Sequence, residues 1–353
     1  MHRYTGAVVT IYQVAEAAGV SPSTVSNYLN GRVGRMQAGT RTRIEQAITR
    51  LGYRPNQAAR QLRTGRTRVI GLVVPSVANP FWGSFARHLE GAALAEGYRV
   101  LLCNSERDPE RERSYLEELW DDGVRGVVLC SALPSLAHAT AVVERGMHLV
   151  AFDRIAQPDD PPGLTDVAVD NALGMALATR HLLELGHRRF AFVSGSLRSV
   201  NRAERFRGFR GAIEAAGLSL SDFVVWPAPE AEAYGDVDLA GLGRAAVAEL
   251  LARPRPPTAI VAINDLCALG VCAGVRDAGL TVGTDISVTG FDDIMLADLV
   301  APPLTTVRQP LPQLAAAAFS QLRQRVEGET SGPGQSVLLR PDLIVRASTA
   351  PHA

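Results

Sequence analysis

Carboxylate, amide, guanidinium and aromatic side chains gather at four points of this chain, each shortly after an apolar run. These points are Asn79–Trp82, Asp153–Arg154, Asn264–Asp265 and Asp292–Asp293. Carboxylates, amides and guanidinium groups can hold paired hydroxyl groups by bidentate hydrogen bonds, and an aromatic face can cover the C–H side of the same molecule. These residue types therefore predict a site that binds a small polar molecule.

The sequence lacks the motifs of the common catalytic classes. Every basic residue is Arg and there is no Lys, which excludes a GK[ST] phosphate loop, a Schiff base and an SxxK nucleophile. No GxSxG or HExxH occurs, and His181 and His187 flank a helix end without metal-ligand spacing. Gly241–Ala246 fits GxGxxA, but no strand is expected before it. We therefore expect no enzyme, no metal and no cofactor.

Apolar runs of strand length alternate with helical stretches from Val69 onward. Because buried strands that alternate with helices are typical of parallel sheets in α/β layers, we expect two such sheets, with a break near Val167–Asp170. Ligands of this class lie beyond the carboxyl ends of the strands. The expected strands are 69–74, 99–103, 126–130, 148–152, 190–194, 259–263 and 287–291, and the expected helices are 81–96, 109–121, 172–185, 202–216 and 239–251.

The segment Ile11–Asn30 is typical of two short helices joined by a tight turn. Its first helix has apolar residues at helical spacing and ends at Gly19, where a left-handed residue is favourable. Ser21 is a good N-cap, and Pro22 suits the first position of the second helix. A third apolar stripe, Ile44–Leu51, can close a small core. The pattern predicts an all-α helix-turn-helix whose second helix enters the DNA major groove.

The charge of the chain is divided between its two parts. Residues 1–66 hold ten arginines and two acidic residues, a net charge of about +8, whereas the remainder holds 26 arginines and 34 acidic residues, about −8. A basic segment neutralises phosphates and releases their counterions. The division therefore supports binding of double-stranded DNA by the N-terminal part.

Composition limits the cellular setting. No apolar run approaches the roughly 20 residues of a membrane span, and the N-terminus has no apolar core of the signal-peptide type. The cysteines are scattered without CxxC spacing, as expected for reduced core residues. We expect a cytoplasmic protein without a membrane partner, associated with the nucleoid when it is bound to its DNA site. The four cysteines are Cys103, Cys130, Cys267 and Cys272.

The chain resembles the lactose/galactose-repressor (LacI/GalR) family of transcriptional regulators over almost its whole length. The matching stretches are VAEAAGVSPSTVSNYLNG, TRTRIEQAITRLGYRPNQAARQLRTGRT, IGLVVPSVANPFW, LLELGHRR, ERFRGF, INDLCALG, DISVTGFDD and PPLTTVRQP, in family order and at family spacing. The resemblance implies a DNA-binding head, a hinge helix, and a two-lobed α/β effector domain of the periplasmic-binding-protein type. It also implies a homodimer on a pseudo-palindromic operator.

The resemblance gives the recognition helix two kinds of contact. It implies that Pro22, Ser23 and Asn27 read base edges. Many members carry Arg at the position of Asn27, which suits guanine, whereas Asn is better matched to adenine N6 and N7. We therefore predict an operator half-site that differs there. Backbone contacts, which position the head without reading sequence, are implied for Thr10, Tyr12, Ser21, Thr24, Ser26 and Asn30.

A second DNA element is implied in the linker. The hinge helix of the family orders on the operator and inserts a paired leucine into the central minor-groove step, with Leu62 at that position, Ala59 beside it and Asn56 as its cap.

The chain departs from the family pattern at the third helix of the head, which is usually preceded by Val-Ser. Here Met36 and Gln37 stand there, so we expect a weaker cap.

The resemblance also assigns an effector site. It places Phe81, Trp82, Asp153, Arg205, Asn264 and Asp292 around the ligand, with Arg107, Val237 and Asp238 as weaker candidates. Each has a plainer alternative: Asn264 or Asp292 as a helix cap, Arg205 paired with Glu204 on the surface, Phe81 as core. The stretch YGDVDLAGLG carries a one-residue insertion and lacks an aromatic residue found in many members. A carbohydrate is favoured over a purine.

The expected organisation follows from these assignments. We expect a head at 1–53, a hinge at 54–67 and an effector domain at 68–350, whose N-lobe is about 68–168 and 308–336 and whose C-lobe is about 169–307 and 337–350. No heptad tail follows residue 350, so a dimer is expected rather than a tetramer. The predicted function is a repressor controlled by a sugar or sugar derivative. The alternatives are a solute-binding protein of a sugar transporter and a regulator with a purine corepressor.

Overall fold

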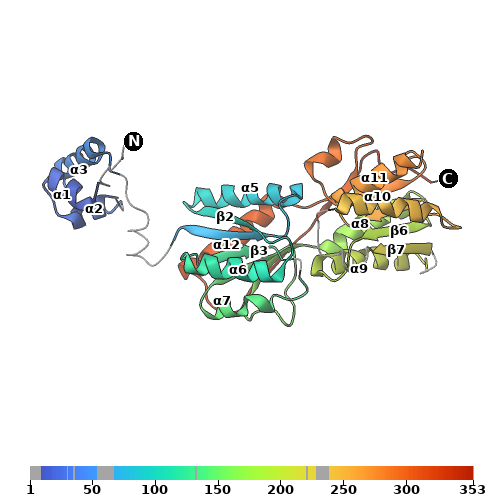
Figure 1. Cartoon of the computed structure of the whole chain (residues 1–353), viewed down its shortest axis with the longest axis horizontal. Helices are drawn as coiled ribbons and strands as arrows, with labels where there is room; N and C mark the ends of the chain where they lie inside the picture. The colour runs from blue at the N-terminus through green and yellow to red at the C-terminus, as the bar shows by residue number, and fades with distance from the viewer. Residues whose placement is uncertain are drawn as a thin grey trace, which may run out of the picture. The chain divides into compact units, whose positions relative to one another are not determined.

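The computed structural model describes residues 9–29, 31–34, 36–53, 67–131, 133–219, 222–227 and 238–352. The chain divides into two compact units, Met1–Arg66 and Thr67–Ala353 (Figure 1). The first unit is helical, and the second contains two six-stranded sheets. This confirms the expected fold class. No helix of the described residues is long and apolar enough to cross a membrane.

The head unit is a three-helix structure, with α1 (Ile11–Ala18), α2 (Pro22–Leu29) and α3 (Ala38–Leu51). The side chain of Thr10 caps α1 and forms a capping box with Gln13, and Gly19 ends the helix with a φ of 63°. At the start of α2, Ser21 Oγ accepts a hydrogen bond from the N–H of Thr24 at 3.2 Å. The small core consists of Val14, Ala15, Ala18, Val25, Ile44 and Ala47.

The third helix of the head begins without side-chain help. Gln37 occupies the N-cap position of α3 in an extended conformation, and its side chain makes no capping hydrogen bond. The weaker cap expected from Met36 and Gln37 is therefore confirmed. At the other end, Gly52 closes α3 with a φ of 60°.

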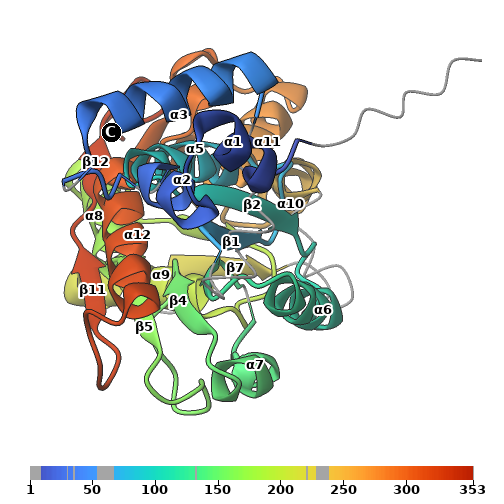
Figure 2. The same ribbon diagram turned by 90° about the vertical axis from the view of Figure 1, so that its left-hand side faces the viewer.

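The first lobe of the second unit is a parallel sheet in the order β11-β5-β4-β3-β1-β2. Apolar residues of α5 and α12 cover one face, and those of α6 and α7 cover the other (Figure 2). Its elements are β1 (Val69–Val74), α5 (Pro80–Ala95), β2 (Arg99–Asn104), α6 (Pro109–Asp121), β3 (Gly126–Leu129), η1 (Ala137–Ala139), α7 (Thr140–Glu144), β4 (His148–Phe152), β5 (Thr165–Val169), α12 (Leu311–Glu327) and β11 (Ser336–Leu339).

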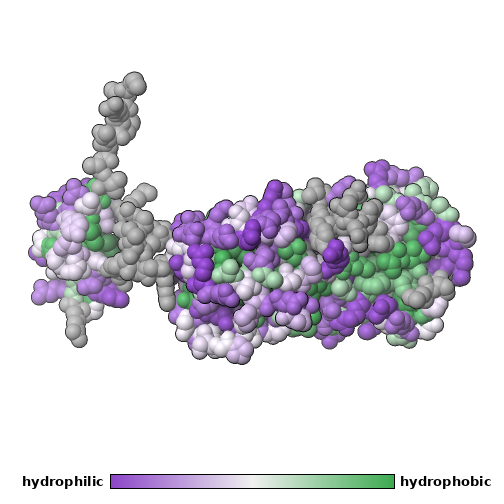
Figure 3. All heavy atoms as spheres, turned by 60° about the horizontal axis from the view of Figure 1, so that its bottom comes forward, coloured by the Kyte–Doolittle hydropathy of each residue, from purple (hydrophilic) through white to green (hydrophobic). Residues whose placement is uncertain are grey.

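The second lobe has a sheet in the order β12-β10-β9-β8-β6-β7, in which β12 alone runs antiparallel to its neighbour among the described strands. Figure 3 shows hydrophobic residues gathering on one face of this lobe. Its elements are α8 (Asn171–Glu184), β6 (Phe190–Ser194), α9 (Val200–Ala215), β7 (Phe223–Pro227), α10 (Leu239–Leu251), β8 (Ala259–Ala262), α11 (Asp265–Asp277), β9 (Ser287–Asp292), η4 (Met295–Asp298), β10 (Thr305–Arg308) and β12 (Asp342–Ile344).

The chain passes between the two lobes at three places. It crosses from β5 to α8 at Asp170, from β10 to α12 at Gln309–Pro310, and from β11 to β12 at Arg340–Pro341. The last crossing differs from the expected boundary at 336/337, because β11 pairs with β5 of the first sheet through Leu339. The expected break near Val167–Asp170 contains the end of strand β5 as well as the first crossing.

Two helix pairs of the second lobe approach each other so closely that only glycine fits between them. A Cβ atom on Gly208 of α9 would lie 2.0 Å from the carbonyl oxygen of Ala172 in α8, and one on Gly270 of α11 would lie 1.9 Å from that of Ala240 in α10. The segment Gly241–Ala246, which matches GxGxxA, lies inside helix α10. Its Gly243 serves helix packing, because a Cβ atom there would lie 2.2 Å from the carbonyl oxygen of Cys267 in α11, whereas Gly241 lies against the carboxylate of the α10 cap Asp238.

Candidate DNA-reading face and effector cavity

The proposed DNA-reading residues lie on the outer side of α2. Ser23 and Asn27 are exposed and Pro22 is half-buried, whereas Val25 of the same helix faces the core. Asn27 therefore presents its amide to solvent, as a base-reading residue requires. Ser23 Oγ is 2.7 Å from Ser21 Oγ, so the first turn of the helix orients this hydroxyl.

The residues expected to contact the DNA backbone surround this face. Tyr12 is 71% exposed on α1, and Thr10, Ser21 and Thr24 lie at or near helix starts, where N–H groups favour phosphates. Ser26 lies in the second turn of α2. Thr10 and Ser21 also cap their helices, so both have a structural role. Several of the expected residues lie outside the described residues: Asn30, the hinge residues Asn56, Ala59 and Leu62, and Val237.

In the second unit, a cavity of about 30 Å³ lies where the carboxyl ends of strands from both lobes meet. The structure thus brings together residues that are far apart in the sequence, including all six of the main effector candidates. The described lining is Asn79, Phe81, Trp82, Arg107 and Asp153 from the first lobe and Asn201, Arg202, Arg205, Ile263, Asn264 and Asp292 from the second.

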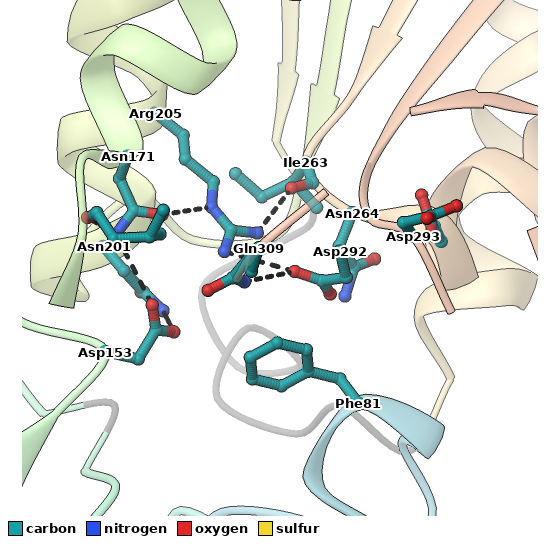
Figure 4. A network of polar contacts seen from close by, with 12 residues as sticks. Phe81, Asp153, Asn171, Asn201, Arg205, Ile263, Asn264, Asp292, Asp293 and Gln309 are labelled. Atoms are coloured by element: carbon teal, nitrogen blue, oxygen red, sulfur yellow. Dashed lines mark hydrogen bonds and ion pairs between the residues drawn. The ribbon is translucent and has the colours of Figure 1, made fainter. Parts of the chain in front are cut away.

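Arg205 is the centre of a buried polar network in this site (Figure 4). Its Nε donates to Asn171 Oδ1 at 2.7 Å, its Nη1 to the carbonyl oxygen of Ile263 at 2.9 Å, and its Nη2 pairs with Asp292 Oδ1 at 3.4 Å. The guanidinium carbon lies 3.7 Å from the centre of the Phe291 ring, a cation–π contact. Glu204, the alternative partner, is instead paired with Arg207.

Asp153 marks the first-lobe side of the network. Burial raises the pKa of this carboxyl group above its ordinary value, and the nearby Arg205 guanidinium and hydrogen bonds from Asn201 and Asn171 oppose the rise. On the second-lobe side, Asp292 Oδ1 also accepts from Gln309 Nε2 at 2.9 Å. The two carboxylates therefore stand on opposite sides of the cavity, each already held by amide donors.

Backbone strain is concentrated at this site. Among the described residues other than glycine, positive φ occurs at or just after the ends of β2, β4 and β9. These residues are Glu106, Arg107, Asp153, Asp292 and Asp293. Three of them, Arg107, Asp153 and Asp292, line the cavity. Such conformations cost energy and cluster where a side chain must be aimed at a ligand.

Two buried polar atoms beside the cavity lack a hydrogen-bond partner within the described part of the chain. They are the indole Nε1 of Trp82 and Oε1 of Gln309. Trp82 lines the cavity, and Gln309 is bonded to Asp292 in its wall. Because nearly all buried polar groups in proteins are paired, this donor and this acceptor indicate that the cavity wall can bind a polar ligand.

The plainer alternatives apply to some candidates. Asn264 lines the cavity and also caps α11 by accepting from the N–H of Cys267 at 3.0 Å, and Phe81 and Trp82 also belong to the first-lobe core. Asp238 caps α10, its carboxylate accepting from the N–H of Gly241 at 2.9 Å, and it is outside the lining. The weaker candidate Arg107 is part of the lining.

Sequence reasoning missed several members of this site: Asn171, Asn201, Arg202 and Gln309. Asn171 and Asn201 stand at the starts of α8 and α9, and Gln309 lies at a crossing between lobes. An amide at the junction of a strand and a helix was the available signal, since such junctions meet at the ligand-binding edge.

The fold and the site define a class of protein: a helix-turn-helix head followed by a two-lobed, periplasmic-binding-protein-like domain with a polar cavity between its lobes. Residues 10–56 match the model of bacterial regulatory proteins of the lacI family, and residues 179–349 match the periplasmic binding protein-like domain. The ribose operon repressor of Escherichia coli (strain K12) is 35% identical over 97% of this chain and 100% of its own.

Solved structures agree over both units. The lac repressor dimer bound to operator and the anti-inducer ONPF superposes with a TM-score of 0.84, at 28% identity, covering 98% of this chain and 100% of that one. The complex of the transcriptional regulator CelR with cellobiose gives a TM-score of 0.68 at 30% identity, covering 96% and 99%. The chain therefore belongs to the lacI family of bacterial regulatory proteins, and it is a ligand-responsive transcriptional regulator.

Proposed function

We propose that this protein is a repressor that binds a pseudo-palindromic operator as a homodimer and is controlled by a neutral carbohydrate bound in the cavity. One observation carries the proposal: a single chain holds both an exposed polar recognition helix and a buried polar cavity between two lobes. The basic head, with a net charge of about +8 over residues 1–66, supplies the attraction to DNA.

On the DNA side, we propose that Asn27 pairs with an adenine in each half-site. Its exposed amide can accept from adenine N6 and donate to N7, whereas an Arg-type site would select guanine. Pro22 and Ser23 complete the base-reading face, and Thr10, Tyr12, Ser21, Thr24 and Ser26 hold the phosphates. Asn56, Ala59 and Leu62 remain the proposed minor-groove element.

On the ligand side, the arrangement of charges favours a polyol. Asp153 and Asp292 stand on opposite sides of the cavity and accept hydrogen bonds, so a ligand with hydroxyl donors at both ends suits them. The free indole N–H of Trp82 and Oε1 of Gln309 add one donor and one acceptor. Hydroxyl groups serve as both, and the Phe81 and Trp82 rings can cover C–H faces. The CelR complex with cellobiose supports the same ligand class.

For the homodimer, we propose that the edge of the first sheet takes part in the subunit contact. β2 is an edge strand, and its Leu101 and Leu102 are 45% and 41% exposed on opposite faces of the sheet. Leu102 is on the face that α5 covers, and Leu94 of α5 is 66% exposed. Unpaired strand edges with apolar side chains favour association. The lac repressor dimer supports a second copy as the occupant. Leu101→Glu with Leu102→Glu should yield monomers in light scattering, whereas exposed Leu338→Glu should leave dimers.

In this proposal, ligand binding changes the angle between the lobes and thereby the spacing of the two heads in the dimer. The ligand needs only a differential affinity for the two arrangements, and the coupling is reciprocal, so operator must alter ligand affinity by the same factor. We place this activity in the cytoplasm, where the operator is.

The test combines operator selection with a ligand screen. Purified protein is used to select duplexes from a random library, and its thermal stability is measured with D-ribose, D-glucose, cellobiose, their phosphates and hypoxanthine. We expect selected pseudo-palindromes whose binding weakens steeply with salt, and a stabilising neutral sugar that changes operator affinity. Retention of no DNA would favour the solute-binding alternative, and stabilisation by hypoxanthine alone would favour a purine corepressor.

A further inference from the structure

Two hydrogen bonds join the two lobes at the cavity, and both are accepted by the Asp153 carboxylate. Asn201 Nδ2, at the start of α9 in the second lobe, donates to Asp153 Oδ2, after β4 in the first lobe, at 2.6 Å (Figure 4). Asn171, beside the first crossing, approaches the other oxygen of the same carboxylate at 3.4 Å. Asp153 is therefore held by the protein's own amide groups.

The orientation of the Asn201 amide follows from its neighbours. Its Oδ1 accepts from the backbone N–H of Arg202 at 2.8 Å and from Ser199 Oγ at 2.9 Å. With the oxygen engaged by two donors, the amide nitrogen has to face Asp153, so the assignment of donor and acceptor is determined by the network. The start of α9 thus aims a hydrogen-bond donor at the first lobe.

The space available makes this contact consequential. The cavity of about 30 Å³ holds about one water molecule, whereas pockets for small ligands measure roughly 300–1,000 Å³. A sugar can enter only if the lobes separate. The hydrogen bond between Asn201 and Asp153 resists that separation, and it occupies the carboxylate that a ligand hydroxyl would use.

We propose that Asn201 is a specificity-determining residue that closes the lobes by occupying Asp153, and that an effector must displace it with a hydrogen-bond donor of its own. The ligand class this selects is one with a hydroxyl group at the Asp153 end. A carboxylate or phosphate at that end offers no donor and meets a like charge. This inference rests on the proposed function in placing the effector in this cavity.

A variant of the same shape tests the closure. Asn201→Asp keeps an oxygen for the Arg202 N–H and for Ser199, but it places a second carboxylate against Asp153, so the lobes should open. Asn104→Asp is the matched control, because the Asn104 side chain accepts from the Val77 N–H within the first lobe and makes the same change of charge. Asn201→Ala removes the donor without adding charge and serves if the aspartate variant does not fold.

The measurement needs neither DNA nor ligand. In the full-length protein carrying Trp120→Phe and Trp226→Phe, Trp82 in the cavity wall is the remaining tryptophan, and it is 5% exposed. Acrylamide quenching of Trp82 should rise several-fold in Asn201→Asp and less in Asn201→Ala, with a larger radius of gyration in X-ray scattering. Asn104→Asp should match the parent. Equal quenching in parent, Asn201→Asp and Asn201→Ala, with circular dichroism unchanged, overturns the proposal.

The sign of an affinity change tests the displacement. Because a hydrogen bond to a charged group must be broken before the ligand binds, a sugar that binds the parent should bind Asn201→Ala about tenfold more tightly in calorimetry. D-Ribose and cellobiose are the first probes. Weaker binding would show that Asn201 is an ordinary ligand contact and would overturn the proposal. If no sugar binds the parent, the proposed carbohydrate function fails, while the quenching result still decides whether Asn201 closes the lobes.

Discussion

The recognition face of the head and the cavity of the two-lobed unit are assembled from very different stretches of chain. Pro22, Ser23 and Asn27 lie within two turns of one helix, whose start is set by the adjacent Ser21 cap. The residues that line the cavity come from the carboxyl-terminal ends of β1, β2, β4, β8 and β9 or the segments that follow them, and from the starts of α5 and α9. The head is thus a local structure with exposed polar groups, and the cavity is a long-range structure with buried ones.

This difference indicates whether a substitution at each site changes mainly binding or mainly stability. On the exposed face, water replaces any lost contact, so substitutions should change DNA selection with little effect on folding. In the cavity, groups such as Arg205, Asn171 and Asp292 are hydrogen-bonded to one another, and removing one leaves the others buried without a partner or water to replace it. Effects on stability should therefore be large in the second unit and small in the head.

The largest effect is expected at Arg205. Arg205→Ala removes the buried partner of Asp292 and Asn171 and should lower the free energy of unfolding by about 3–5 kcal/mol. The matched control is Arg207→Ala, two residues along the same helix. The Arg207 side chain is 62% exposed and pairs with Glu204, so the loss should stay below about 1 kcal/mol. Urea unfolding followed by circular dichroism measures both. Equal losses of unfolding free energy in the two variants would mean that burial of Arg205 does not increase its contribution to stability.

The second effect concerns pH and the buried His187, which has hydrogen-bonding contacts with Thr258, Ser287 and the carbonyl oxygen of Ala350. Burial lowers the pKa of His187 from 6.5 to about 4. His187 binds a proton more readily in the unfolded chain than in the folded chain. Its neutral form therefore contributes to the free energy of unfolding above pH 6.5, and this contribution is lost as the pH falls toward 4, by about 3 kcal/mol.

His187→Gln isolates this contribution. The variant should be less stable than the parent at pH 7, yet its unfolding free energy should decline less between pH 7 and pH 4. Parallel declines for the two proteins in urea titrations would contradict a proton-linked role for His187. The head should contribute little to the slope, because its described residues 9–29, 31–34 and 36–53 contain no histidine.

The third effect belongs to the exposed face. Asn27→Arg should move the preferred base in each half-site from adenine to guanine, with a discrimination of about 1–3 kcal/mol per half-site, while thermal stability stays within experimental error. Binding-site selection on parent and variant gives the measurement. An unchanged consensus would remove Asn27 from the base-reading set, and Glu45→Gln on the outer face of α3 is a suitable control variant.

The smallest effect separates the helix-capping role of Ser21 from the DNA-contacting role of Ser23 in the first turn of α2. Ser21→Ala should cost about 1 kcal/mol in the local stability of α2, because the N–H of Thr24 loses its acceptor. Ser23→Ala should leave that stability unchanged and weaken operator binding instead. Hydrogen exchange of the α2 amides in the full-length protein measures the local stability of the helix, and filter binding measures operator affinity. Loss of protection in both variants would contradict the division of roles.

The sequence predicted the head in detail because its signals are local. Gly19, Ser21 and Pro22 act on neighbouring residues, and the structure confirms the helix limits they predict. The capping role of Thr10 was not predicted. The seven expected strands and five expected helices were also found, with small shifts at their ends. Apolar runs that are buried on both faces carry a strong signal.

Other elements gave weaker signals. Strand β5 contains Asp166, β7 ends at Pro227, and β10 has Val307 as its only large apolar residue. Helices α11 and α12 lacked a marked start signal in the expected pattern. Asn171 and Asn201 were missed because the site depends on which strand and helix ends meet, and this is fixed by sheet order and by the close approach at Gly208. The positive φ angles at Arg107, Asp153 and Asp292 likewise result from tertiary contacts.

The three crossings between the lobes have a consequence for synthesis. The first lobe receives α12 and β11 only after the whole of α8–β10 has been made, so its sheet lacks an edge strand and a covering helix until the last part of the chain leaves the ribosome. Until then the apolar face that Leu314, Ala318 and Leu322 later cover is open to other chains. A ribosome stalled between residues 310 and 340 would hold a nascent chain in its most aggregation-prone form.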